Sequence, residues 1–90
     1  MVNDKVRDKF ESACKDAKTL KAPDNATLGY LYGHYKQATA GDCNAPSPSI
    51  WDITNKAKHQ AWSELRGMSE EVAMVNYTKK VRALKKAEEH

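Results

Sequence analysis

The sequence predicts an all-α fold in which four helices form one bundle. Apolar residues recur at intervals of three and four along four segments of the chain. Each segment is bounded by capping residues, proline or glycine, and none alternates apolar and polar residues as a strand would. A chain of 90 residues is expected to form a single domain over residues 1–90, too thin for a deep enclosed cavity.

The first helix is expected from about Asn3 to Leu20. Asn3 or Asp4 could cap its start, and the residue before Pro23 cannot continue a helix. Its apolar stripe is formed by Val6, Phe10, Ala13, Cys14 and Ala17.

The second helix is expected between the capping residue Asp24 and the terminating Gly41. Its stripe is Leu28, Leu31, Tyr32, Tyr35 and Ala38. Gly29 and Gly33 each cost about 1 kcal/mol relative to alanine in a helix. We attribute Gly29 to close helix packing. Gly33 fits either packing or the close approach of a ligand.

The third helix follows an irregular stretch, residues 41–49, in which two prolines forbid a helix. A loop of this length allows the helices beside it not to be antiparallel neighbours. The third helix is expected from Asp52 to about Arg66, with Gly67 as its end. Its expected inner face is Ile53, Ala57, Ala61, Trp62 and Leu65.

The fourth helix is expected to begin after the capping residue Ser69. Its apolar stripe is the most regular of the four, and lysines and arginine crowd its last turns, where they suit the helix dipole. The stripe is Met74, Tyr77, Val81 and Leu84.

Composition and motifs exclude several function classes. The net charge of +3 favours an anionic partner but is too small to indicate nucleic acid. No apolar run approaches the ~20 residues of a membrane span, and the first residues contain no apolar signal core. We therefore expect a cytoplasmic protein with no stable membrane insertion and with free thiols at Cys14 and Cys43, although a disulfide between them remains open. Metal-ligand spacings and catalytic motifs are absent, so we expect no metal, no cofactor and no enzyme.

One short run carries a positive signal. Tyr32 and Lys36 lie one turn apart on a helix, and Tyr35 lies close to the same side. Two phenols and an ammonium could hold a phosphorylated nucleotide, whereas the alternative is half-buried rings beside a solvated lysine. By themselves, Lys18 and Lys58 are ordinary surface lysines, Tyr77 and Trp62 are core residues, and His34 is a surface or partly hydrogen-bonded residue.

Taken together, these residues make the sequence resemble the acyl-CoA-binding protein family. The resemblance rests on the run from Leu31 to Thr39 (LYGHYKQAT), with Gly41-Asp42, and on matches in segments 56–67 and 73–86. It implies an up-down-down-up bundle that binds medium- to long-chain acyl-CoA, such as palmitoyl-CoA, reversibly as an intracellular carrier and buffer in lipid metabolism. The chain departs from the family at His59, where a tryptophan is usual, and carries an aromatic at Trp51 instead.

The resemblance also implies a set of ligand-binding residues. Tyr32, Lys36 and Lys58 would hold the ribose 3′-phosphate, Tyr35 would pack on adenine, and Lys18 and Tyr77 would complete the contacts. The whole implied set is Lys18, Tyr32, Gly33, His34, Tyr35, Lys36, Lys58 and Tyr77. We expect a monomer. The alternatives are a small helical interaction module or peptide-ligand precursor acting through a protein partner, and an esterase or transferase acting on acyl-CoA.

Overall fold

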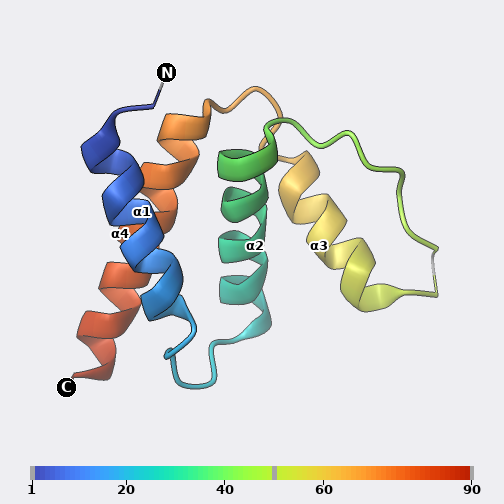
Figure 1. The fold of residues 1–90 in the computed structure, drawn as a ribbon. Coiled ribbons are helices and arrows are strands. Elements are labelled where there is room, and N and C mark those ends of the chain that lie inside the picture. Colours follow the sequence, from blue (N-terminus) through green and yellow to red (C-terminus); the bar gives the residue numbers. More distant parts are fainter. Residues whose placement is uncertain (1, 50, 90) are drawn as a thin grey trace.

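The computed structural model describes residues 2–49 and 51–89 and contains four helices (Figure 1). They are α1 (Asp4–Ala17), α2 (Asn25–Ala40), α3 (Ile53–Ser63) and α4 (Glu70–Glu88). The described residues contain no strand, so the all-α prediction is confirmed.

The helix starts follow the capping residues that the sequence indicated. Asn3, and not Asp4, caps α1 by accepting a hydrogen bond from the Lys5 amide at 2.8 Å. Asp24 caps α2, and Ser69 caps α4 by accepting from the Val72 amide at 3.1 Å. Each cap satisfies an amide that has no partner within its helix.

Two helices end earlier than the sequence predicted. α1 stops at Ala17, three residues before Leu20, and α3 stops at Ser63, three residues before Arg66. In both cases the chain continues through turns in which amides bond to carbonyls three residues back, as from Arg66 to Ser63 at 3.2 Å. Gly67, at φ +92°, then takes a backbone conformation that favours glycine.

The helices run in the order that the family resemblance implied. α1 and α4 run in one direction, and α2 and α3 run in the other, which gives the up-down-down-up arrangement (Figure 1). α2 and α3 can be parallel neighbours because the long segment 41–52 carries the chain back along their length (Figure 1). α4 packs on both α1 and α2, whereas α3 packs on α2 alone.

The apolar core lies among α1, α2 and α4. The stripes predicted for the first and fourth helices meet here, with Leu31 and Ala38 from α2. The buried members are Phe10, Ala13, Leu31, Ala38, Ala73, Met74, Tyr77 and Val81. The molecule is a flat slab, with principal extents of 38 × 34 × 16 Å. Since a helix with its side chains is about 10 Å across, such a slab holds ligands in surface grooves rather than in enclosed cavities.

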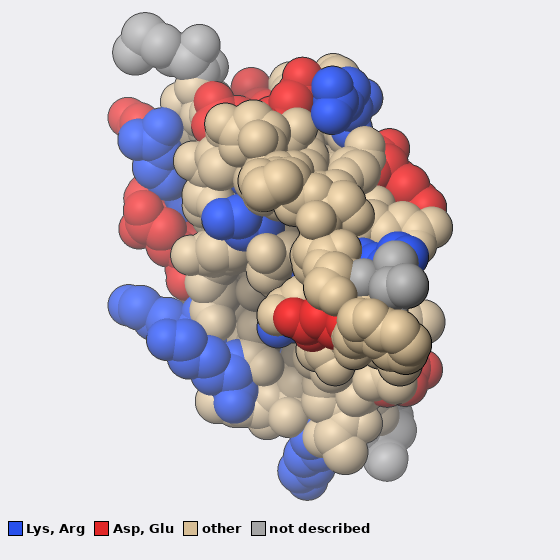
Figure 2. Space-filling view, turned by 90° about the vertical axis from the view of Figure 1, so that its right-hand side faces the viewer, with Lys and Arg blue, Asp and Glu red and all other residues tan. Residues whose placement is uncertain are grey.

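The inner face predicted for the third helix is only half right. Trp62 is buried, but Ile53 is 77% exposed and Ala57 is exposed as well. Since α3 has only α2 as a neighbour, the first turns of α3 have no core to enter. On the side of the molecule that carries α3, uncharged residues cover most of the surface, with a few charged groups among them (Figure 2).

The contact between α2 and α3 depends on Gly33. A Cβ atom built there would lie 2.7 Å from the carbonyl oxygen of Ala61, whereas one at Gly29 would lie 3.9 Å from the Ala61 Cβ. A separation of 2.7 Å is shorter than real Cβ atoms show, so only glycine allows this approach. Packing is therefore a demonstrated role of Gly33.

Side-chain hydrogen bonds attach the 41–52 segment to the helices. The buried Gln37 donates from Nε2 to Asp42 Oδ1 and to the Met68 carbonyl, both at 2.8 Å. Asp42 also accepts from the Gly67 amide at 2.8 Å, and the Trp62 indole donates to the Gly41 carbonyl at 2.8 Å. The Gly67 and Gln37 hydrogen bonds lower the pKa of Asp42 below its ordinary value. These bonds hold the end of α2 and the start of the 41–52 segment against the C-terminal end of α3.

Candidate functional site

Five of the eight predicted site residues line one open groove. Lys18 reaches it from the end of α1, Tyr32 and Tyr35 from α2, Lys58 from α3 and Tyr77 from α4. The groove has a volume of about 530 Å³, and we call it the lysine groove. Residues from all four helices thus converge at one place, although they are spread over about 60 positions of the sequence.

The lysines at this site have no carboxylate partner. Within the described residues the one ion pair is Lys85–Glu88, far along α4. The Lys58 ammonium instead lies 5.5 Å from the centre of the Tyr32 ring, and the Lys36 ammonium lies 4.9 Å from the centre of the Trp62 ring. Ammonium groups resting on aromatic faces keep their charge available for an anion.

Lys36 lies beside the lysine groove rather than in its lining. It is one turn from Tyr32 on α2, and its half-buried chain extends toward α3 through Trp62. The structure therefore places Lys36 and Lys58 on facing helices, each against an aromatic ring. Two cations in this arrangement suit a multiply charged anion such as a phosphate.

Three aromatic side chains pack together where α1, α2 and α4 meet, beside the lysine groove. Phe10 packs edge-on against Tyr77, with ring centres 5.1 Å apart, and Tyr35 lies 6.1 Å from Phe10 and 6.3 Å from Tyr77. Tyr35 is 43% exposed, so one side of its ring is open to a planar ligand. Burial, and secondarily the nearby Cys14, raises the pKa of Tyr77 well above its ordinary value, so its hydroxyl stays protonated.

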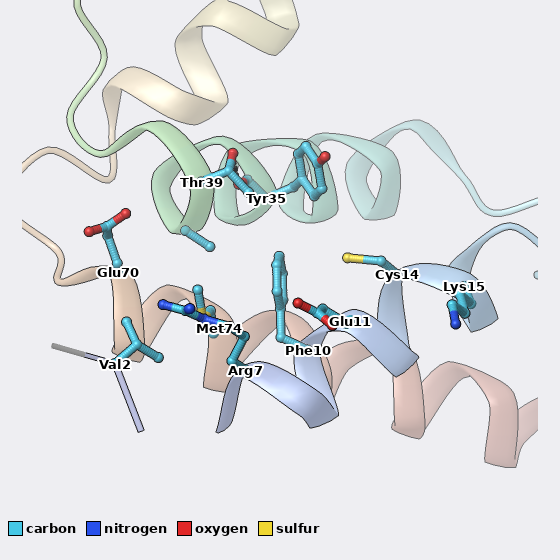
Figure 3. Close-up of a pocket in the computed structure, with 11 residues that line it drawn as sticks. Val2, Arg7, Phe10, Glu11, Cys14, Lys15, Tyr35, Thr39, Glu70 and Met74 are labelled. Atoms are coloured by element: carbon cyan, nitrogen blue, oxygen red, sulfur yellow. Dashed lines mark hydrogen bonds between the residues drawn. The ribbon is translucent and has the colours of Figure 1, made fainter. Parts of the chain in front are cut away.

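A second groove continues from this cluster toward the start of α1. Figure 3 shows Phe10 and Tyr35 facing each other across it from α1 and α2, with Cys14 beside them. It has a volume of about 660 Å³, and we call it the Phe10 groove. Although it is the larger of the two, only Tyr35 of the predicted residues lines it. Cys14 and Tyr35 line both grooves, so the two grooves are adjacent.

A third groove separates the first turns of α2 and α3. It has a volume of about 210 Å³, and we call it the α2–α3 groove. Leu28, Gly29, Ile53 and Ala57 provide most of its apolar lining. Leu28 and Lys58 also line the lysine groove, so the two grooves are adjacent.

The two remaining predicted residues have structural partners. Gly33 is buried against the α3 backbone, as described above. His34 is buried, and its Nδ1–H donates to the Tyr30 carbonyl at 2.8 Å while its ring stacks on Tyr30 at 4.1 Å. His34 is thus a satisfied core residue rather than a surface one. Neither residue lines the lysine groove.

Sequence reasoning missed Phe10 and Cys14 as lining residues. Both lie on the apolar stripe of the first helix, where burial in the core is the ordinary interpretation. The open space between α1 and α2 places an edge of each beside a groove, although Phe10 itself stays buried in the core. Burial raises the pKa of the Cys14 thiol, while the neighbouring Tyr77 hydroxyl acts in the opposite direction. Cys14 and Cys43 are both free thiols.

Within residues 2–49 and 51–89, no three His, Cys, Asp or Glu side chains come close enough together to bind a metal ion. No helix in the same ranges combines the length and the apolar character that crossing a membrane requires.

Comparisons with known proteins agree on one family. Residues 7–81 match the family model described as acyl-CoA-binding protein. The chain is 49% identical over 81 residues to mouse diazepam-binding inhibitor-like 5, covering 88% of this chain and 92% of that protein. It is 43% identical over 76 residues to human enoyl-CoA delta isomerase 2, where the match covers 83% of this chain but only 19% of the isomerase.

Solved structures give the same result. The chain superposes on the rice (Oryza sativa) acyl-CoA-binding protein 2 with a TM-score of 0.92 and 35% identity, covering 94% of each chain. An acyl-CoA-binding protein of Moniliophthora perniciosa superposes with a TM-score of 0.85 and 35% identity, covering 90% of this chain and 81% of that one.

Proposed function

This chain belongs to the acyl-CoA-binding protein family, and from that premise we propose that it binds medium- to long-chain acyl-CoA reversibly and carries and buffers it in the cytoplasm. One observation supports this most directly. Lys18, Lys58 and three tyrosines converge on a single open groove, in which the lysines have no carboxylate partner. The two free thiols fit a reducing compartment.

The nucleotide end of the ligand would occupy the lysine groove. Lys58 and Lys36, from facing helices, would bind the ribose 3′-phosphate with the Tyr32 hydroxyl, and Lys18 would meet a further phosphate. Adenine would lie on the open side of Tyr35, at the junction with the Phe10 groove. Charge-assisted hydrogen bonds to phosphate contribute about 1.5–3 kcal/mol each.

The acyl chain would occupy the α2–α3 groove. Leu28, Ile53 and Ala57 would cover its methylenes, and each methylene removed from water contributes about 0.8 kcal/mol. About eight buried methylenes would supply some 6 kcal/mol before the entropic costs of binding. The first turns of α3 thus remain exposed in the free protein because their partner is the ligand.

Gly33 and His34 would contribute by position. Gly33 sets the distance between α2, which carries Tyr32 and Lys36, and α3, which carries Lys58. His34 holds the α2 backbone of that turn through its bond to Tyr30. We propose that neither Gly33 nor the His34 side chain touches the ligand, and that no residue of the chain performs chemistry on the thioester.

Isothermal titration calorimetry with palmitoyl-CoA and with free CoA tests the proposal. We expect one ligand per monomer and much tighter binding of the ester. Lys58→Ala should weaken binding by about 10–100-fold, since it removes one charged contact. Lys56→Ala is a matched control, because Lys56 lies on the same helix but outside the lysine groove.

The salt dependence provides a second criterion. The Debye length falls from about 8 Å at physiological salt to about 3 Å at 1 M, so the effect of Lys58→Ala should shrink as salt is added. Equal affinities for CoA and palmitoyl-CoA would refute the acyl groove. Release of free thiol from palmitoyl-CoA above background would contradict the absence of chemistry. No binding of either ligand would favour the interaction module instead.

A further inference from the structure

A small groove between α1 and α4 lies apart from the proposed ligand site. It has a volume of about 170 Å³, and we call it the α1–α4 groove. Its lining residues are Val6 and Lys9 from α1 and Val75, Thr78, Lys79 and Arg82 from α4. None of them lines the lysine groove, the Phe10 groove or the α2–α3 groove. α1 and α4 pack together on the side of α2 away from α3, so α3 does not reach this groove (Figure 1).

Three cations border the α1–α4 groove. Lys9, Lys79 and Arg82 are all exposed. Lys79 and Arg82 lie three residues apart, which makes them neighbours on one face of α4, and Lys9 joins them from α1. In the described part of the chain the one ion pair is Lys85–Glu88, so none of the three cations is paired with a carboxylate there.

The helix dipole does not account for these cations. Its effect is confined to the last turn of a helix. α4 ends at Glu88, and the cations of its last turn are Lys85 and Lys86. Lys79 and Arg82 precede that turn, so they repel each other without a gain from the dipole. Anionic groups from outside the chain would relieve this repulsion.

The α1–α4 groove also has an apolar lining. Val6 and Val75 are half-buried, so they lie deeper than the exposed cations beside them. The hydroxyl of the buried Thr78 donates to the Met74 carbonyl at 2.8 Å, so it is occupied within α4. An apolar cavity of about 150 Å³ holds one benzene-sized group. A groove of about 170 Å³ therefore takes a single apolar side chain, not a nucleotide with its acyl chain.

This combination fits an acidic protein segment better than a bilayer. A bilayer is entered by apolar side chains that project from a protein, whereas Val6 and Val75 are recessed between cations. A recessed apolar spot of this kind is complementary to one apolar side chain flanked by carboxylates. Stable interfaces between globular proteins bury about 800 Å² on each partner, so a groove this small suits a short segment.

We propose that the α1–α4 groove docks a short acidic segment of another protein. One apolar side chain of the segment enters beside Val6 and Val75, and the carboxylates on either side of it meet Lys9, Lys79 and Arg82. The docking itself does not depend on the proposed function, because the groove shares no lining residue with the ligand site. Its use, to hold the loaded protein at a partner while the ligand site stays open, rests on the proposed function.

Amide NMR spectra of the isotope-labelled full chain test the docking with a defined probe. The probe is an acetylated octapeptide of glutamates with one central leucine. We expect saturable chemical-shift changes at Lys9, Val75 and Arg82, with the same midpoint at all three. Replacing the leucine by alanine should weaken binding about tenfold, since it removes most of the buried apolar group. High salt should weaken both peptides.

Two variants with the same change of charge separate the α1–α4 groove from the rest of the surface. Arg82→Gln should weaken binding of the leucine peptide about two- to fivefold, the size expected of one exposed ion pair. Lys56→Gln should leave it unchanged, because Lys56 is an exposed cation on α3, which does not reach the groove. Circular dichroism establishes that both variants are folded.

Several outcomes would overturn the docking. They are shift changes confined to the lysine groove, equal binding of the leucine and alanine peptides, which would indicate charge attraction alone, or equal weakening by both variants. Flotation on phosphatidylserine vesicles that Arg82→Gln abolishes, without any loss of peptide binding, would assign the groove to a bilayer instead.

Palmitoyl-CoA titration of the same sample keeps the two proposals apart. Binding of palmitoyl-CoA without binding of the leucine peptide would refute the docking alone. Peptide binding without palmitoyl-CoA binding would refute the carrier function alone. If both bind, saturating palmitoyl-CoA should leave the shift changes at Lys9 and Arg82 in place, and displacement of the peptide would refute the separate groove.

Discussion

The close approach of α2 and α3 at Gly33 can be tested by adding one methyl group. In Gly33→Ala the new Cβ would lie 2.7 Å from the carbonyl oxygen and 2.9 Å from the carbonyl carbon of Ala61. These are backbone atoms of α3, so relief requires the whole helix to move. Overpacking of this kind costs about 1–3 kcal/mol, against a gain of about 1 kcal/mol from replacing a helical glycine. The net change should be about 0–2 kcal/mol of destabilisation.

Gly29→Ala is the matched control. It lies one turn earlier on α2 and faces the same Ala61, but its Cβ would sit at an ordinary contact distance of 3.9 Å. Gly29→Ala should therefore only raise the stability, by up to about 1 kcal/mol, because alanine is a better helix former than glycine. A change of 1 kcal/mol shifts the Tm of a domain this size by about 4–8 °C. Thermal unfolding followed at 222 nm should therefore give Gly29→Ala a higher Tm than Gly33→Ala by at least about 4 °C.

The same pair tests the link between packing and the site. A displaced α3 carries Lys58 away from Tyr32 and Lys36, so Gly33→Ala should also weaken palmitoyl-CoA binding. Gly29 lines the α2–α3 groove, so Gly29→Ala is a control for stability alone. Equal stabilisation by both alanines would refute the argument, because it would mean that α3 yields to the added methyl group without cost.

Two further predictions concern titratable groups. Bound palmitoyl-CoA should slow alkylation of Cys14, because Cys14 lines both the lysine groove and the Phe10 groove. Mass spectrometry can follow the alkylation, with the buried Cys43 as internal reference. An unchanged rate of Cys14 alkylation would place the ligand elsewhere. The pKa of Asp42 is lowered in the folded state by its Gly67 and Gln37 hydrogen bonds, so its stabilisation is present above the ordinary value of 3.8 and is lost as the pH falls through the lowered pKa. The Tm of Asp42→Asn should therefore fall less than that of the wild type on acidification, and parallel curves would contradict the assigned role.

Much of the site was visible in the sequence because its residues lie on helices with strong local signals. Tyr32, Tyr35 and Lys36 share one side of α2 as a consequence of helical spacing alone. Lys18, Lys58 and Tyr77 could be assigned only through resemblance to a family, since nothing local distinguishes them from other lysines and a core tyrosine.

Other parts of the site depend on pairings between helices that periodicity does not encode. An apolar stripe indicates that a face is sheltered but not by what. The apolar face of α1 borders the Phe10 groove as well as the core, and the sequence pattern does not distinguish the two. Phe10 and Cys14 were therefore assigned to the core alone. The apolar face of α3 is covered by α2 at one end only, so Ile53 and Ala57 remain exposed.

The sequence by itself determined the four helices, the residues that cap them and the glycines and prolines that separate them, because these depend on interactions within a few residues. Tertiary structure decided which helices touch, and so where grooves remain. The carbonyl of Ala61 requires glycine at position 33, and the bonds of Gln37, Asp42 and Trp62 fix the segment that returns the chain to α3. The contacts of Gly33 with Ala61 and of Trp62 with Gly41 join residues more than twenty positions apart, and with them Lys58 comes to lie near Tyr32.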